Sequence, residues 1–270
     1  MQISFTKMQG AGNDYIYIDA SRYPISNPES LARRLSDRHF SVGADGLVLI
    51  MPSDKADIRM RMFNADGSEA QMCGNASRCV ARYAVDHGLV KGNDFNLETL
   101  AGIKTLHVEE NEVCVDMGEP LITTLKADSS LVLAQDSSVI ITAQDLTLVD
   151  MGNPHAVCFV GDVSDYPVCQ IGPLVEHHPL FPNRTNVEFV QVLDDTHLKM
   201  RVWERGTGET MACGTGACAS AVAAVLKGLV KPKTHVHVLG GDLLIRWDRS
   251  SNHVFLQGPA EYSFEGTIQL

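Results

Sequence analysis

The sequence lacks the features that mark membrane, secreted and nucleic-acid-binding proteins. Apolar stretches such as Leu47–Met51 fall far short of a membrane span, which takes about 20 apolar residues. The N-terminal segment has no apolar signal-peptide core. No block of Lys and Arg interrupts the net charge of −11, so nucleic acids and anionic membranes are poor candidates as partners. We therefore expect a cytoplasmic protein.

Cysteine pairs separated by two residues are also missing, although the chain has seven cysteines. An odd number without a secretory signal indicates reduced thiols rather than a disulfide framework, which leaves some thiols available for chemistry. The 270 residues are 44% hydrophobic and 20% charged. This composition argues against disorder, collagen and coiled coil, and it fits one large domain or two smaller ones.

The chain repeats itself at a single ungapped offset of 140 residues. This offset aligns Gly12-Asn13 with Gly152-Asn153, and Cys73-Gly74 with Cys213-Gly214. From Cys73 to Lys91, nine of 19 positions are identical to their partners. Chance similarity of two Ala-rich helices is the alternative, but it would not also align strands and Gly-Asn pairs.

The repeat predicts an α+β protein with two pseudo-symmetric lobes. We place the N-terminal lobe, with Cys73, at residues 1–125 and the C-terminal lobe, with Cys213, at residues 126–270. A polar stretch at Thr123–Ser130 joins them. Equivalent loops of two such lobes face each other, so we expect the active site in the cleft between the lobes.

Within each lobe the pattern predicts strands around one long buried helix. Alternating apolar residues predict strands at Tyr15–Asp19, Leu47–Met51, Ile58–Phe63, Val113–Met117, Ala156–Val160, Val187–Val192, Leu198–Trp203 and Val254–Gln257. Asn27-Pro28-Glu29 predicts a helix start, with the helix running to about Arg38. The long helices are expected from just after Cys73 to Gly88 and from just after Cys213 to Gly228.

Both repeats place Cys-Gly and a polar residue where a strand turns into a helix, as Cys73-Gly74-Asn75 and Cys213-Gly214-Thr215. A helix N-terminus offers unpaired N–H groups and a partial positive charge, so it can bind a carboxylate and lower the pKa of a thiol. Two such thiols on opposite sides of one carbon form an acid/base pair.

Other uses of these thiols remain open. A lone cysteine is usually a small buried apolar residue, which suits Cys79, Cys114, Cys158, Cys169 and Cys218. A disulfide redox pair usually has two cysteines separated by two residues, and this chain has no such pair. Zinc is a weaker alternative, because His177-His178 diverge and His235 and His237 lie on an expected strand, so we expect no metal.

Several motifs, in the right order from about Met8 to Ala260, resemble those of diaminopimelate epimerases. They are Gly10–Asp14, Phe63–Glu69, Met72–Asn75, Gly152–His155, Arg184–Phe189, Trp203–Gly206 and Ala212–Gly216. Taken alone, the Cys-Gly-Thr-Gly motif would be shared with proline racemases. The full set favours a substrate with a second amino-acid end.

The resemblance implies lobes of mostly antiparallel sheet or barrel wrapped around a central helix. It also implies an isomerase that interconverts L,L- and meso-diaminopimelate in lysine and peptidoglycan precursor biosynthesis. One thiolate would remove the α-proton and the opposite thiol would return one, without pyridoxal phosphate, metal or other cofactor. The expected partner is a small amino-acid substrate, and a homodimer is possible.

The resemblance further implies the site residues. Cys73 and Cys213 would be catalytic, with His155 in support. The substrate would contact Asn13, Asn64, Gly74, Asn75, Asn153, Asn186, Glu204, Arg205, Gly214 and Thr215. The chemistry of these side chains supports the assignment. An Arg guanidinium can form two parallel hydrogen bonds with a carboxylate, while Glu and Asn oxygens accept hydrogen bonds from an ammonium. The simpler alternatives are structural. Glu204 and Arg205 would then form a surface ion pair, the asparagines would form turns, and His155 would be a structural imidazole.

The chain departs from the family pattern at two positions. Some relatives have glutamine where this chain has Gly46, so one substrate contact is missing or replaced. Ala76 stands where glycine is commoner. The competing functions are a racemase of another amino acid such as proline or histidine, a non-catalytic binding protein of the same fold, and a thiol-redox protein.

Overall fold

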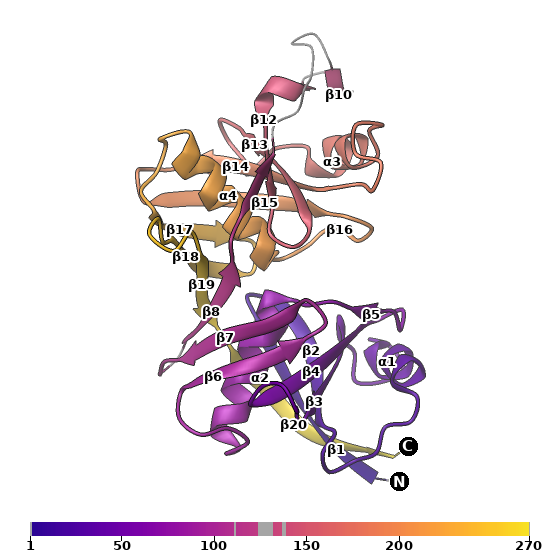
Figure 1. Cartoon of the computed structure of the whole chain (residues 1–270). Helices are drawn as coiled ribbons and strands as arrows, with labels where there is room; N and C mark the ends of the chain where they lie inside the picture. Colours follow the sequence, from indigo (N-terminus) through magenta and orange to yellow (C-terminus); the bar gives the residue numbers. More distant parts are fainter. Residues whose placement is uncertain (1, 111, 124–131, 137–138, 270) are drawn as a thin grey trace. The chain divides into compact units, whose positions relative to one another are not determined.

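The computed structural model describes residues 2–110, 112–123, 132–136 and 139–269 and divides into two compact units (Figure 1). Unit 1 comprises Met1–Asp116 and Gln257–Leu270, and unit 2 comprises Met117–Leu256. The last strand therefore belongs to unit 1, whereas the sequence analysis assigned it to the second lobe. From residue 124 on, the predicted joining segment lies outside the described residues.

Unit 1 is built mostly of strands. Its elements are β1 (Gln2–Gly10), β2 (Asn13–Asp19), α1 (Pro28–Ser36), β3 (Gly46–Met51), β4 (Ile58–Asn64), β5 (Glu69–Ala70), α2 (Gly74–Asp86), β6 (Asp94–Thr99), β7 (Gly102–Val108), most of β8 (Glu112–Gly118) and β20 (Glu261–Gln269). The N- and C-terminal strands pair antiparallel, with Ile3 opposite Ile268. Both ends of the chain therefore lie in this unit (Figure 1).

Unit 2 also combines strands with two α-helices. Its elements are β9 (Leu121–Thr123), β10 (Val132–Asp136), β11 (Val139–Thr142), the 3-10 turn η1 (Ala143–Asp145), β12 (Leu146–Asp150), β13 (Pro154–Phe159), α3 (Val168–Glu176), β14 (Asn186–Val192), β15 (His197–Glu204), β16 (Gly208–Glu209), α4 (Gly214–Leu226), β17 (Lys233–Val238), β18 (Gly241–Trp247) and β19 (Val254–Pro259). The chain leaves unit 2 for unit 1 within β19, after Leu256.

The repeat predicted from the sequence is confirmed by the elements. The bounds of α3 and α4 are those of α1 and α2 shifted by 140 residues. Strand pairing repeats as well: β2 lies parallel to β3 as β13 does to β14, and β4 lies parallel to β6 as β15 does to β17. Most other described pairings are antiparallel, for example β3 with β4 and β14 with β15.

The long helix of each unit is buried among strands, as predicted. Ten residues of α2 and ten of α4 are buried. In unit 2, α4 packs against β12, β13, β14, β15, β17 and β18. A helix buried on several sides needs small apolar residues all round, which explains the Ala-rich stretch Ala217–Ala224. Within the described residues, no helix is both long and apolar enough to cross a membrane.

The predicted strands and helix starts are confirmed, with small differences at the ends. Asn27 caps α1 by accepting a hydrogen bond from the Ser30 amide at 2.9 Å. This helix ends at Ser36 rather than Arg38. Asp37 is the cause, because its carboxylate accepts the amides of His39 and Phe40 and turns the chain away from the helix axis.

Candidate active site

In unit 1, Cys73 occupies the position immediately before α2. Its extended backbone, with φ −134° and ψ 125°, makes it the N-cap residue, and its carbonyl accepts the Ser77 amide at 2.9 Å. The half-buried thiol donates a hydrogen bond to Asn13 Oδ1 at 3.4 Å. The thiol therefore lies at the positive end of a buried helix, as the sequence predicted.

Asn13 links Cys73 to the helix start and to a charged cluster. The side-chain amide of Asn75 also donates to Asn13 Oδ1, at 3.4 Å. The Asn13 amide donates to Asp45 Oδ2 at 2.6 Å, and Arg38 donates to the other oxygen of Asp45 at 2.9 Å. The sequence analysis missed Asp45, although it singled out the adjacent Gly46. This chain of contacts turns the Asn13 carbonyl toward the thiol.

Asn64 is held separately, in the tight turn between β4 and β5. Its side-chain amide donates to Ser68 Oγ at 3.0 Å, and its backbone amide donates to the Ser68 carbonyl at 2.9 Å. Asp66 accepts both the amide and the hydroxyl of Ser68, at 2.8 and 2.6 Å. The turn therefore fixes the orientation of Asn64 independently of the Cys73 cluster.

Gly46 is a position where the structure explains the departure from the family pattern. A Cβ atom there would lie 2.1 Å from the Phe63 carbonyl oxygen and 2.9 Å from a ring carbon of Tyr15. Because backbone occupies the space of the missing side chain, this strand register accepts only glycine. A substrate contact from this position is therefore absent in this chain.

In unit 2, Cys213 stands before α4 as Cys73 stands before α2. Its sulfur accepts the Gly216 amide at 3.4 Å and lies 3.4 Å from the Thr215 hydroxyl. The residue is only 7% exposed. Burial raises the pKa of the Cys213 thiol, and the carboxylates of Glu204 and Glu188 raise it further.

The pKa of Cys213 thus differs from the sequence expectation of a lowered value. Hydrogen bonds from Thr215 and Gly216 do lower the pKa, but burial and two negative charges outweigh them. In unit 2 considered by itself, Cys213 is therefore a protonated thiol at neutral pH.

His155 lies in a largely buried polar cluster next to Cys213. Its Nδ1 is 2.7 Å from Glu188 Oε1, and its Nε2 is 3.0 Å from Asn153 Oδ1. His155 and Glu188 are 1% and 0% exposed. Glu188 was missed as a functional residue, yet it carried a signal: it is the one charged residue within the apolar strand Asn186–Val192.

Glu204 and Arg205 lie where β15 ends, and we call this segment the Glu204-Arg205 corner. Its conformation is fixed by hydrogen bonds that involve the backbone rather than by an ion pair between the two side chains. The Arg205 amide donates to Asn186 Oδ1 at 3.0 Å, and the Asn186 side-chain amide donates to the Pro154 carbonyl at 2.8 Å. The Arg205 side chain is exposed, and its guanidinium donates to the Asn183 carbonyl at 3.2 Å. The half-buried Glu204 accepts the Thr210 hydroxyl at 2.5 Å.

Buried Glu176, at the end of α3, positions the same corner. It accepts Trp203 Nε1 at 2.7 Å and the Gly206 amide at 3.0 Å. Nothing in the sequence distinguished this residue, because its two partners come from a strand and a loop about 30 residues further along the chain.

The structure thus joins the predicted residues into separate groups within the units. Unit 1 brings together Cys73, Asn13, Gly74 and Asn75 and holds Asn64 in a neighbouring strand turn. Unit 2 brings together Cys213, Gly214, Thr215, His155 and Asn153, and connects Asn186 to Arg205.

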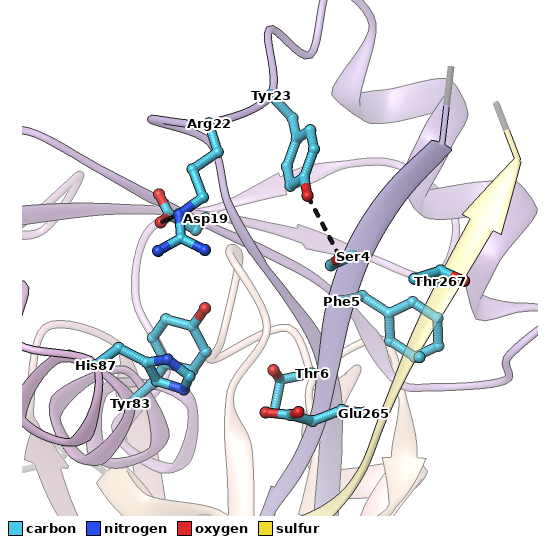
Figure 2. A pocket seen from close by; sticks show the side chains of 11 residues that line it. Ser4, Phe5, Thr6, Asp19, Arg22, Tyr23, Tyr83, His87, Glu265 and Thr267 are labelled. Atoms are coloured by element: carbon cyan, nitrogen blue, oxygen red, sulfur yellow. Dashed lines mark hydrogen bonds and ion pairs between the residues drawn. The ribbon is translucent and has the colours of Figure 1, made fainter.

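A cavity of about 500 Å³ in unit 1 lies apart from these groups. Figure 2 shows its lining: Tyr83 and His87, stacked at 4.0 Å near the C-terminal end of α2, face β1 and β20. None of the residues predicted for catalysis or substrate binding lines this cavity. It is therefore not the candidate active site.

Solved structures with the same fold include several epimerases. Over 99% of this chain, a predicted epimerase from Pseudomonas aeruginosa superposes with a TM-score of 0.74 at 16% identity, covering 99% of that chain. A hydroxyproline epimerase from Agrobacterium vitis gives 0.70 at 15% identity, with 99% and 92% coverage. Such identities concern the fold alone. The fold and the two helix-start cysteines define a two-unit α+β protein with one cysteine at the start of the long helix of each unit.

The particular family follows from sequence comparison. The family model for diaminopimelate epimerase matches residues 5–123 and 147–263. The chain is 53% identical over 275 residues to a diaminopimelate epimerase of Acetivibrio thermocellus, covering 98% of each chain. It is 54% identical over 280 residues to one of Methanococcus maripaludis, covering 99% of this chain and all of that one. The chain belongs to the diaminopimelate epimerase family.

Proposed function

We propose that this protein interconverts L,L- and meso-diaminopimelate by inverting one α-carbon. The observation that carries the proposal is the pair of cysteines that begin α2 and α4 at equivalent positions in the two repeats. Family membership over nearly the whole chain supports the substrate. A racemase acting on another amino acid is not favoured, because the relatives of similar length share this one name.

The chemistry needs one group to remove the α-proton and a second to deliver a proton to the opposite face. Cys213 holds its proton because burial and the carboxylates of Glu204 and Glu188 raise the pKa of its thiol. A protonated Cys213 suits the donor role in one direction, in which Cys73 is the base. In the reverse direction the roles exchange, and each thiol contributes roughly 10²–10⁴-fold to the rate.

The helix starts supply the second part of catalysis. An α-proton is weakly acidic, and its removal places negative charge on the substrate carboxylate. Amide groups at Gly74-Asn75 and Gly214-Thr215 precede the first intrahelical hydrogen bonds, so they can donate to that carboxylate. These donors are already fixed by the buried helices, so no reorganisation is needed when the charge develops.

The remaining polar groups fit the second amino-acid end of the substrate. The exposed Arg205 guanidinium can form paired hydrogen bonds with a carboxylate. Glu204 and the side-chain oxygens of the predicted asparagines can accept from an ammonium. Since Asn186 and Glu176 fix the backbone at Arg205 and Gly206, this corner is preorganised.

Further parts of the proposal concern the setting of the enzyme. We place it in the cytoplasm, in the formation of lysine and peptidoglycan precursors, working on a free amino acid without pyridoxal phosphate. A homodimer is part of this proposal. The half-exposed Tyr262 and Phe264 on β20 would suit such an interface, and light scattering after gel filtration measures the assembly directly.

The substrate is tested by proton NMR of the reduced protein in D₂O. With L,L-diaminopimelate we expect loss of the α-proton signal together with formation of the meso isomer. A panel of single amino acids, including proline and histidine, is the control. Exchange with a single amino acid but not with diaminopimelate would contradict the proposal.

A further inference from the structure

A buried set of three potential metal ligands lies within unit 2. One donor atom each from His155, Glu188 and Cys213 lies within 4.8 Å of the others, and all three residues are buried. Tetrahedral zinc has bonds of about 2.0–2.3 Å to such ligands, which places ligand atoms roughly 3.5 Å apart. Small side-chain rotations therefore close the set around one ion.

Glu188 has an oxygen that the cluster does not use. Its Oε1 is 2.7 Å from His155, whereas its buried Oε2 has no hydrogen-bond partner among the described residues. A buried carboxylate oxygen without a partner is costly, since it has lost its hydration without compensation. A cation bound at Glu188 would satisfy it.

The contacts of His155 favour a ligand role for the nitrogen that points at Glu188. Without an ion, Nδ1 at 2.7 Å donates to Glu188 Oε1, whereas in a metal-bound cluster the proton moves to Nε2, which can donate to Asn153 Oδ1 at 3.0 Å. Metal-bound histidines commonly donate their other N–H to a carbonyl or carboxylate in this way. Nδ1 is then the atom that can bind an ion on the side of Glu188.

Gly216 leaves room for an ion between the ligands. A Cβ atom at this position would lie 2.7 Å from Glu188 Oε1 and 3.3 Å from Cys213 Sγ. Glycine therefore keeps open the space that the carboxylate and the sulfur share, and its amide lies 3.4 Å from that sulfur.

We propose that His155, Glu188 and Cys213 form a binding site for a zinc ion that blocks the Cys213 thiol. Nitrogen, oxygen and thiolate sulfur ligands together suit zinc better than magnesium or calcium. Binding converts the thiol to a thiolate and releases its proton to solvent. Because Cys213 then holds a metal ion, it can no longer exchange a proton with the substrate, so zinc acts as a reversible inhibitor.

The test measures metal binding directly, in a Cys73→Ala background that removes the equivalent thiol of unit 1. The reduced, metal-free full chain is titrated with zinc by calorimetry and with cobalt by absorption spectroscopy. We expect one ion per chain and a thiolate-to-cobalt charge-transfer band. Since this variant lacks one proposed catalytic base, the result does not depend on epimerase activity.

Variants locate the site. Cys213→Ser should abolish the charge-transfer band, and Glu188→Gln should weaken zinc binding at least about tenfold. His155→Gln provides a second ligand variant if Glu188→Gln melts below the parent. His237→Asn is the matched control, because His237 belongs to a surface row of stacked rings with His197. Binding that survives Cys213→Ser, disappears in His237→Asn or requires Cys73 would overturn the proposal.

Discussion

At the scale of single residues, the two helix-start cysteines differ in their surroundings although they occupy equivalent positions. Cys73 is half-buried and hydrogen-bonded to a neutral amide, whereas Cys213 is buried beside two carboxylates. The repeat predicted their equivalence, and the residues around them could not be predicted from spacing. Glu188 and Asp45 reach the sites through side-chain contacts between strands and loops distant in sequence.

Glu204→Gln should make Cys213 more reactive while weakening substrate binding. The Glu204 carboxylate raises the pKa of the Cys213 thiol, so its removal lowers that pKa and increases the thiolate fraction at a given pH. We expect the pH profile of Cys213 alkylation by iodoacetamide, followed by mass spectrometry, to move to lower pH. At a fixed pH below the pKa the rate should rise up to about tenfold.

Glu209→Gln is the control for this experiment. Glu209 lies in the same unit, but Arg201 neutralises it at 2.6 Å and it is not among the groups that raise the pKa of Cys213. The profile of this variant should match that of the parent. An unchanged profile in Glu204→Gln, or the same displacement in both variants, would contradict the electrostatic explanation.

At the scale of elements, the sequence predicted the long helices and eight strands but missed α3 and several strands, among them β1 and β20. Helix α3 is the repeat of α1, yet it has no side-chain cap and contains Pro173, a residue typical of helix ends. Its bounds were recoverable only from the 140-residue offset. The placement of β20 in unit 1 depends on its pairing with β1, a contact between residues more than 250 positions apart.

Gly46→Ala tests the close approach of β3 and β4. The new methyl group would lie 2.1 Å from the Phe63 carbonyl, so the strands must separate. We expect a loss of about 2–3 kcal/mol in the free energy of unfolding, measured with urea. Gly161→Ala is the matched control, because nothing lies within 4 Å of its Cβ position, and it should cost less than about 0.5 kcal/mol. Equal stability of the two variants would show that the strand register is wrong.

At the scale of the whole molecule, the account requires two units that each supply one acid/base group. The repeat in sequence and the shared order of helices and strands both support two copies of one ancestral unit. The sequence predicted this division because a 140-residue repeat is visible without any structure. The unit boundaries were harder to predict from the sequence, because the chain passes from one unit to the other within β8 and again within β19.

Mild oxidation should inactivate the enzyme reversibly. The proposed two-base mechanism requires the thiols of Cys73 and Cys213 to approach one carbon from opposite faces, so it predicts that they form a disulfide on oxidation without substrate. We expect dithiothreitol to restore activity and peptide mapping to identify the Cys73–Cys213 link. Cys169→Ala, which removes an exposed thiol, should inactivate in the same way. Full activity after complete oxidation of both thiols would argue against the mechanism.

The most direct test of the two-base claim is epimerisation by the single cysteine variants. Cys73→Ala and Cys213→Ala are each incubated with L,L-diaminopimelate, and formation of the meso isomer is followed by proton NMR. Cys169→Ala serves as the active control, and circular dichroism confirms that each variant is folded. The account predicts loss of epimerisation in both variants and normal turnover in the control. Near-wild-type turnover in either Cys73→Ala or Cys213→Ala would contradict it.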